Sequence, residues 1–309
     1  MRTTPARFAS YLALLTAVIS GTANFVNKLA TTAVPDPIFF TTLKNGVTAV
    51  LLIGLLLAFR QGREIRRLTG RQWAKLIAIA VIGGSIPFTL FFTGLTQTSA
   101  LNASLIHKTL FLWVALLAVP LLKERLSFPQ WLGVAAIFSA NFFVGGFTGF
   151  KFNTGELLIL GATILWAVEN VIAKIALRDI SSGTVAAGRM VLGTMILFGL
   201  SAVRGTLGQA SSLNATQWGW IILTGALLTG YVLTWYTALK YAPATFVVTL
   251  LVPATLVTNL LSAIFVTHQL PASQLGSGVL LILGSILMIF FAKRTVETAA
   301  VPKPKFRQS

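Results

Sequence analysis

Long apolar runs, separated by short polar links, follow one another along almost the whole chain. A helix needs about 20 mostly apolar residues to cross the hydrocarbon core of a bilayer. Ten runs are long enough, and we expect transmembrane helices at 8–30, 37–58, 73–96, 99–121, 129–148, 154–177, 182–203, 216–239, 244–267 and 271–292. The pattern predicts an all-α membrane protein with ten transmembrane helices and no soluble domain between them.

The composition agrees with this interpretation and narrows the chemistry. The chain is 55% hydrophobic and 10% charged, with a mean hydropathy of +0.83, whereas soluble domains carry about 25% charged residues. It has no cysteine and only two histidines, so we expect no disulfide, no metal site and no cofactor. A net charge of +17 would suggest a nucleic-acid partner in a soluble protein. In a membrane protein it is typical of basic cytoplasmic loops, so we expect a lipid bilayer and no nucleic acid as partner.

Lysine and arginine are distributed unevenly between the two sides that these spans define. With the N-terminus in the cytoplasm, 17 of the 24 basic residues lie on the cytoplasmic side, and only Lys151 and Arg204 lie clearly outside. Because positive residues concentrate in cytoplasmic loops, we expect both termini in the cytoplasm. Trp73, Trp131 and Trp218 stand at or near the starts of spans, as in an interfacial aromatic belt.

The chain contains an internal repeat with an offset of about 145 residues. "NFVNKLA" (24–30) corresponds to "NVIAKIA" (170–176), Lys44 to Arg189, and Trp73 to Trp218. Each copy holds five spans, and an odd number places the second copy in the opposite orientation. We therefore expect two inverted five-helix repeats, at 1–150 and 151–295, followed by a basic cytoplasmic tail at 296–309. Such repeats are typical of secondary transporters, with the substrate site near the midplane.

Several motifs, taken in order, resemble the EamA-type ten-helix transporters of the drug/metabolite transporter superfamily over about residues 8–292. They are "GTANFVNK" (21–28), Glu124 and Gly133 in "LKERLSFPQWLG" (122–133), "GATILWAVENVIAK" (161–174), Arg189 in "AAGRMVLG", and Pro253 in "LLVPATLVTNLLSAIF" (250–265). The resemblance implies a multi-pass carrier of the bacterial inner membrane that works by alternating access, with export as the direction. The absence of a nucleotide-binding motif indicates that gradients or exchange supply the energy.

The sequence departs from the family pattern at two places. His268 stands where the second repeat usually has the acid that Glu124 represents in the first. Thr109 is the repeat partner of Pro253, so the fourth span lacks the expected proline and carries "IHKTLF" (106–111) instead. His107 and Lys108 in this segment are the most individual feature of the chain.

Five ionisable side chains lie deep within the predicted spans, where each costs at least about 2.5–3.5 kcal/mol to insert and therefore tends to mark function. They are Lys44, His107, Lys108, Glu169 and Arg189. Lys28 and Lys174 lie nearer the span ends, and for both we favour snorkelling into the lipid headgroups.

Glu169 is the only carboxylate expected well inside the membrane, and two roles remain open for it. It pairs with Lys44, Lys108 or Arg189 to hold the bundle together, since a buried charge needs a partner. Alternatively, Glu169 or His107 exchanges a proton during transport, which would make the carrier proton-coupled.

Three buried cations facing one carboxylate favour an anionic or zwitterionic metabolite, such as an amino acid, over a cationic drug. Aromatic residues of the fourth, sixth and eighth spans, among them Trp113, are expected to shape the site. The candidate substrate-binding residues are Lys44, His107, Lys108, Trp166, Glu169, Asn170, Arg189, Trp235 and Tyr236. Pro87 and Pro253 are the candidate kinks that allow helices to move.

Proteins of other classes fit the sequence less well. No H-E-x-x-H, G-x-S-x-G or Walker A pattern occurs, so we do not expect an enzyme. A channel would not need an inverted repeat, and a non-transporting sensor or scaffold would lack a signalling domain. The remaining expectations are a small-molecule substrate and a monomer or homodimer.

Overall fold

The computed structural model describes residues 5–34, 36–59, 62–98, 100–140, 149–269 and 272–291. Helices without any strand make up this part of the chain. Eight helical segments are long and apolar enough to cross a membrane, and Phe128–Ala140 and Leu275–Phe290 are shorter apolar helices. Together they correspond to the ten expected spans. The expected tail at 296–309 and the end of the fifth span at 141–148 lie outside the described residues.

Within the described residues, seven spans are single helices. Six of these are the first, second, fifth, sixth, seventh and tenth spans. They are α1 (Pro5–Ala33), α2 (Pro37–Ala58), α8 (Phe128–Ala140), α9 (Thr154–Ala176), α10 (Ser182–Val203) and α14 (Ala272–Phe290). The eighth span, α11 (Ala215–Tyr241), is also continuous. The links are short and include α3 (Gly62–Ile65) and the 3₁₀ turn η2 (Leu207–Ser212).

The third, fourth and ninth spans are interrupted. Ser85 separates α4 (Gly70–Gly84) from α5 (Ile86–Leu95), and Thr109 separates α6 (Ala100–Lys108) from α7 (Leu110–Leu122). The ninth span consists of α12 (Ala244–Thr249), α13 (Ala254–Ser262) and the π-helical turn η3 (Ala263–Thr267).

Two of the breaks contain a proline, which cannot donate the helical hydrogen bond. The break at Thr109 has no proline. There the threonine hydroxyl donates to the carbonyl of Ile106 at 2.6 Å, in place of continued α-helical bonding. The fourth and ninth spans are therefore broken at positions that the repeat makes equivalent.

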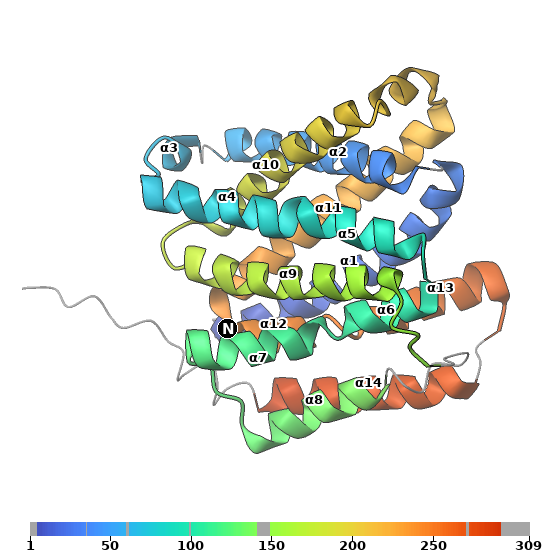
Figure 1. The fold of residues 1–309 in the computed structure, drawn as a ribbon. Helices are drawn as coiled ribbons and strands as arrows, with labels where there is room; N and C mark the ends of the chain where they lie inside the picture. The colour runs from blue at the N-terminus through green and yellow to red at the C-terminus, as the bar shows by residue number, and fades with distance from the viewer. Residues whose placement is uncertain are drawn as a thin grey trace, which may run out of the picture.

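Helices of the first half pack mainly against helices of the second half. In this way α1 packs on α11, α2 on α10, α4 and α5 on α9, and α8 on α14, a pair that lies together at the bottom of Figure 1. Glycines allow close approach: a Cβ on Gly84 would lie 3.2 Å from the Cα of Gly193, and a Cβ on Gly133 would lie 2.8 Å from the carbonyl oxygen of Gly284. The two repeats thus share one long interface through the centre of the molecule.

The ends of the fourth and ninth spans correct the repeat alignment by one residue. Each span ends in a residue with left-handed backbone conformation, Lys123 with φ 57° and His268 with φ 53°. His268 is therefore the structural counterpart of Lys123, not of Glu124. The sequence offset could not reveal this, because a shift of one residue hardly changes a match between apolar runs.

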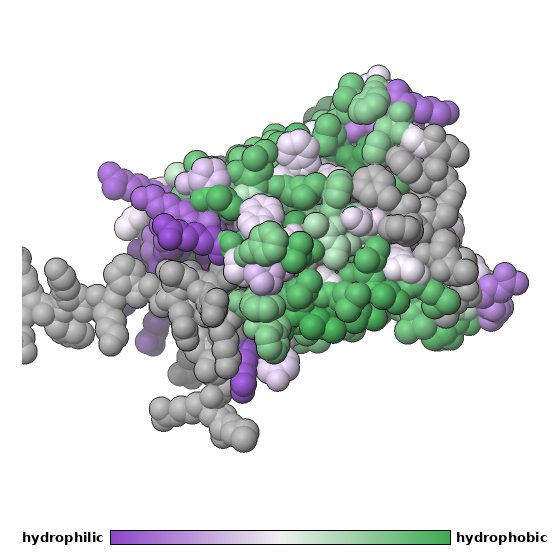
Figure 2. All heavy atoms as spheres, turned by 90° about the horizontal axis from the view of Figure 1, so that it is seen from below, coloured by the Kyte–Doolittle hydropathy of each residue, from purple (hydrophilic) through white to green (hydrophobic). Residues whose placement is uncertain are grey.

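The surface has the character of a membrane protein. On the face seen in Figure 2, hydrophobic side chains cover the middle of the molecule and hydrophilic ones gather toward its two ends. Trp73, Trp131 and Trp218 are partly exposed near helix starts, in line with an interfacial belt. We refer to the end that carries α3 and the α9–α10 link as the inner end, and to the opposite end as the outer end.

Candidate functional site

The centre of the site is the carbonyl oxygen of Gly83, near the break in the third span. Pro87 lies four residues later and has no N–H, so the helix leaves this carbonyl without its usual donor. Two side chains of the second repeat fill the gap. Trp166 Nε1 of α9 and Arg189 Nη2 of α10 each donate to the Gly83 oxygen at 3.0 Å. The Gly83 carbonyl of the first repeat, which lacks its helical donor, thus accepts hydrogen bonds from two side chains of the second repeat.

Glu169 lies on the same face of α9, three residues after Trp166. It packs so closely on Gly83 that a Cβ there would overlap the Glu169 side chain. The hydroxyl of Tyr236 on α11 donates to Glu169 Oε1 at 2.6 Å, and the glutamate is only 2% exposed. The carboxylate is therefore held between α4, α9 and α11, close to the midplane of the bundle.

The expected ion pair of Glu169 with a lysine or with Arg189 does not form. Within the described ranges, only Lys75–Asp179 and Arg204–Asp36 meet the 4.0 Å limit for an ion pair. Arg189 is near enough to interact with Glu169 through its charge, while its guanidinium contacts the Gly83 carbonyl. The Glu169 carboxylate is thus held by the Tyr236 hydroxyl and the Arg189 guanidinium by the Gly83 carbonyl, and the two charged groups do not touch.

Three polar atoms around this centre are buried and have no partner among the described residues. They are Arg189 Nε, Asn170 Oδ1 and His107 Nδ1. The other end of the Asn170 amide donates to the Trp166 carbonyl at 2.8 Å, which fixes its orientation. Buried polar atoms without a partner require an explanation, such as a bound molecule or water.

Aromatic rings form one wall of the centre. The His107 ring lies 4.8 Å from the Trp166 ring and 5.5 Å from Phe91, and Phe88 lies 5.4 Å from Trp166. The sequence analysis did not name Phe88 or Phe91. Their spacing of three residues directly after Pro87 was the available signal, because it places both rings on one face of α5.

Trp235 lies apart from this wall. It is buried and stacks on Tyr231 at 5.9 Å with an interplanar angle of 11°. Tyr231 in turn is near enough to Arg189 to interact with its charge. Trp235 therefore supports the centre from α11 through its contact with Tyr231.

The two lysines expected at the site form no ion pair with Glu169 among the described residues. Lys44 is buried in the outer half of α2, where its ammonium group lies 5.4 Å from the centre of the Phe40 ring. Lys108 is half-buried at the end of α6, next to His107, and makes no hydrogen bond or ion pair within the part of the chain that the structure describes. Sequence spacing placed both at plausible depths but could not show the direction of either side chain.

Lys174 does not extend toward the headgroups as expected. Its ammonium group donates to the carbonyls of Leu239 and Ala242, both at 2.6 Å, and so satisfies the C-terminal end of α11. Lys28, its repeat partner, is exposed, which agrees with snorkelling. The shared motif therefore serves different roles in the two repeats.

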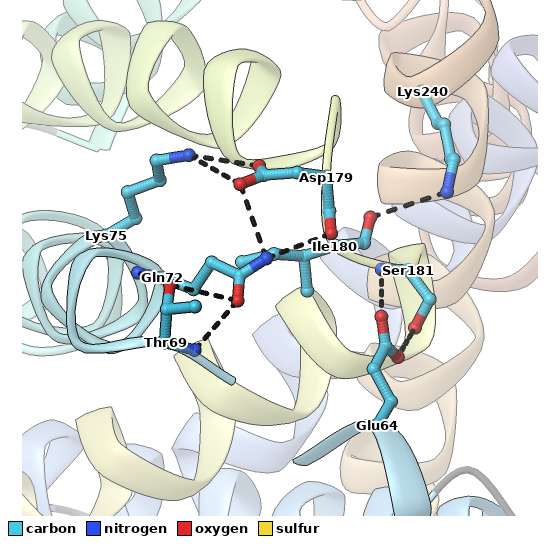
Figure 3. A network of polar contacts seen from close by, with 8 residues as sticks. All are labelled: Glu64, Thr69, Gln72, Lys75, Asp179, Ile180, Ser181 and Lys240. Atoms are coloured by element: carbon cyan, nitrogen blue, oxygen red, sulfur yellow. Dashed lines mark hydrogen bonds and ion pairs between the residues drawn. The ribbon is translucent and has the colours of Figure 1, made fainter. Parts of the chain in front are cut away.

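A polar network ties the two repeats together at the inner end (Figure 3). At the start of α10, Glu64 of α3 accepts a hydrogen bond from the Ser181 backbone N–H at 2.8 Å. A further hydrogen bond to Glu64 comes from the Thr184 hydroxyl at 2.6 Å. Lys75 of α4 pairs with Asp179 at 3.0 Å. Partial burial alone raises the pKa of Glu64, but its hydrogen bonds with Ser181 and Thr184 outweigh this and lower the pKa below its ordinary value.

A second tie at the same end involves Glu124, which the family resemblance identified. Its carboxylate accepts from the backbone N–H groups of Ala244 at 2.6 Å and Thr245 at 3.0 Å. It therefore caps the first turn of α12, which belongs to the other repeat. The network of Glu64 was missed because its acid and its partners are more than 100 residues apart in sequence.

Comparison with known proteins agrees with this architecture. A sequence model of the EamA-like transporter family matches residues 7–146 and 153–291. An uncharacterized transporter of Synechocystis sp. is 28% identical over 263 residues, which cover 79% of this chain and 73% of that protein. The uncharacterized transporter YyaM of Bacillus subtilis is 26% identical over 182 residues, covering 57% of this chain and 59% of its own.

A solved crystal structure with 20% identity superposes with a TM-score of 0.77 and covers 93% of this chain and 98% of that one. At this identity the likeness shows the fold alone. The family match, in contrast, extends over both halves of the chain. The chain is a multi-pass membrane protein that belongs to the EamA-like transporter family of the drug/metabolite transporter superfamily.

Proposed function

We propose that this transporter is a secondary carrier that exports a small anionic or zwitterionic metabolite, such as an amino acid, across the bacterial inner membrane by alternating access. Both termini lie in the cytoplasm, in agreement with the basic residues of the inner end. The solute site is formed by His107, Trp166, Glu169, Asn170, Arg189 and Tyr236. The membrane-transporter role itself follows from the family.

One observation carries the proposal: a charged, incompletely paired cluster lies between the two repeats near the middle of the spans. Trp166 and Arg189 share the Gly83 carbonyl, and Glu169 lies beside them with Tyr236 as its donor. Buried charges are costly unless they have partners. A solute that brings a carboxylate to Arg189 and an ammonium group to Glu169 would complete both.

The interrupted spans support movement around this cluster. The fourth and ninth spans break at positions equivalent in the repeats at 1–150 and 151–295, beside His107 in one and at Pro253 in the other. Discontinuous helices at the repeat interface are typical of transporter binding sites. Rocking at Pro87, Thr109 and Pro253 would open the inner ties while the outer end closes.

Glu169 is also our candidate for proton coupling. It is the one described carboxylate that lies in the middle of a span, since Glu124 and Glu156 lie near span ends. Protonation would neutralise the Glu169 carboxylate, which would then no longer need a charged partner. In proteoliposomes, a proton-coupled carrier responds to an imposed pH gradient, and Glu169→Gln removes that response. Wild-type transport that is indifferent to the gradient excludes coupling through Glu169.

The direct test is uptake by proteoliposomes of amino acids, organic acids, phosphorylated metabolites and cationic drugs. We expect an acidic or zwitterionic compound to be transported, with loss of transport in Arg189→Met. Arg71→Met is the matched control, because it removes an exposed cation of the inner end that belongs neither to the cluster nor to the ties between the repeats. Equal loss in both variants, or transport of cationic drugs alone, contradicts the proposal.

A second candidate, export of cationic or amphipathic drugs, is favoured by the aromatic wall. The rings of Phe88, Phe91 and His107 each lie within ring-contact distance of Trp166. Aromatic faces bind cations and flat apolar groups. Arg189 in the same site opposes a cation, which is why this candidate ranks second.

A further inference from the structure

The outer half of α2 buries a group of polar side chains that the central cluster does not use. Thr41, Lys44 and Asn45 are at most 8% exposed, and Thr41 and Asn45 are fully buried. The neighbouring threonines bond to their own helix, with Thr42 donating to Ile38 at 2.9 Å. The Thr41 hydroxyl does not, and it finds no partner among the described residues.

Asn45 is more unusual still, because both ends of its side-chain amide lack a partner. Nδ2 and Oδ1 are buried and unbonded within the described part of the chain. A buried polar group that is cut off from water and has no partner destabilises the folded protein. The nearby Thr194 hydroxyl of α10 is in the same condition, and its methyl group would lie 4.0 Å from a Cβ on Gly46.

These side chains share one face of α2. Residues three and four apart are neighbours on a helix, so Thr41 lies one turn above both Lys44 and Asn45. Lys44 faces the Phe40 ring and has no carboxylate within 4.0 Å in the described ranges. This part of α2 therefore offers three kinds of donor: an ammonium group, an amide NH₂ and a hydroxyl.

The charge decides what such a group binds. A metal cation would coordinate the amide and hydroxyl oxygens, but the ammonium group of Lys44 repels it. An anion accepts hydrogen bonds from all three side chains and neutralises Lys44. We propose that Thr41, Lys44 and Asn45 form a second anion-binding site, which takes a carboxylate group or a small inorganic anion such as chloride.

This site is separate from Arg189. Thr42 of α2 is hydrogen-bonded to Ser201 of α10 at 3.0 Å, which sets the two antiparallel helices level at that point. Lys44 lies two residues from Thr42 along α2 and Arg189 lies twelve residues from Ser201 along α10, both in the direction of the inner end. At 1.5 Å per residue, the two cations are therefore about 15 Å apart along the helices. A single amino acid does not span that distance.

The inference rests on the proposed function, since it places a second anion position along the same transport path. In the present conformation α10 and α11 close the site, because Asn45 is fully buried and Thr48 donates to the Gly225 carbonyl at 2.9 Å. An anion binds only after α2 separates from α10. The bound anion therefore stabilises the conformation in which α2 and α10 are apart.

Thermal unfolding of the purified full chain tests the site with chloride and acetate, each replacing the bulky sulfonate anion of HEPES at constant ionic strength. We expect both to raise the midpoint of the wild type. Thr41→Val and Asn45→Leu should weaken anion binding about tenfold or more, since each removes a hydrogen bond to a charged group. In HEPES alone both variants should be at least as stable as the wild type, because an apolar group replaces an unpaired polar one.

Thr48→Val is the matched control on the same helix. It removes the bond to Gly225 that helps to close the site, so it should lower the midpoint in every salt and leave the response to chloride and acetate at least as large as in the wild type. A response to acetate alone identifies the carboxylate of the solute as the ligand, whereas a response to both identifies a site for inorganic anions as well. No response of the wild type, or equal loss of response in Thr48→Val and Thr41→Val, overturns the proposal.

The outcome is separable from that of the proposed function. A wild type that transports a solute through Arg189 but shows no response to chloride or acetate overturns the second site alone. A wild type that transports no tested solute, yet shows an anion response that depends on Thr41, overturns the proposed substrate and leaves the second site standing.

Discussion

Arg189 and Glu169 should be energetically coupled although they form no direct ion pair. Arg189→Met and Glu169→Gln, alone and together, form a double-mutant cycle that isolates the coupling. Methionine keeps much of the arginine stem, and glutamine keeps a group that can accept from Tyr236. Each single change is expected to destabilise the protein because it leaves the other charge without its counterpart.

The magnitude follows from the geometry. The two charges are more than 4.0 Å apart, since no ion pair between them meets that limit in the described residues. Two unit charges at 4 Å and an effective dielectric constant of 20 interact by about 4 kcal/mol, which is an upper limit here. At twice the distance the value halves, so we expect a coupling of about 1–3 kcal/mol.

The free energy of unfolding, measured for the four proteins in mixed micelles at several pH values, gives the coupling. It should be largest where Glu169 is ionised and should vanish where it is protonated. Lys75 and Asp179 provide the control cycle, because they are closer, at 3.0 Å, but exposed. Their coupling should be only about 0.2–1 kcal/mol. A coupling for Arg189 and Glu169 no larger than that of the control at every pH would refute the reasoning.

Three further changes have defined outcomes. Gly83→Ala places a Cβ on the Glu169 side chain, so it should cost about 1–3 kcal/mol of stability and reduce solute transport, both measurable on the purified variant. The pKa of Glu64 is lowered in the folded protein. The ionised Glu64 therefore stabilises the fold fully above its ordinary pKa of 4.5, and this stabilisation is lost as the pH falls through the lowered pKa. Glu64→Gln should flatten this part of the stability–pH curve. Lys174→Met leaves the last carbonyls of α11 unpaired and should lower stability by about 1–3 kcal/mol in unfolding assays. The variant should respond to chloride and acetate as the wild type does.

Ten spans and their duplication were readable in the chain because both depend on local properties. Whether a segment crosses a bilayer depends on about 20 consecutive residues, and an offset of about 145 between similar motifs needs no knowledge of packing. The same applies to the candidate residues Trp166, Glu169 and Arg189, whose depth in a span follows from counting. These three do lie together around Gly83.

The partners of these residues required the packed molecule. Counting along a helix gives the depth of a side chain but not the neighbour it meets, and that neighbour comes from another helix far away in sequence. For this reason Glu169 binds Tyr236 instead of a lysine, and Lys174 caps α11 instead of reaching the headgroups. The break at Thr109 could not be predicted from the sequence either, because no proline stands at that position.

Polar groups that the fold leaves unpaired are visible only after every helix is in place. Thr41 and Asn45 look in the sequence like any other polar residues near a span end. A side chain lacks a partner only because all its neighbours point elsewhere, which is a property of the whole assembly of helices. The chain thus encodes its membrane topology locally, whereas the chemistry of its interior arises from contacts between the two repeats.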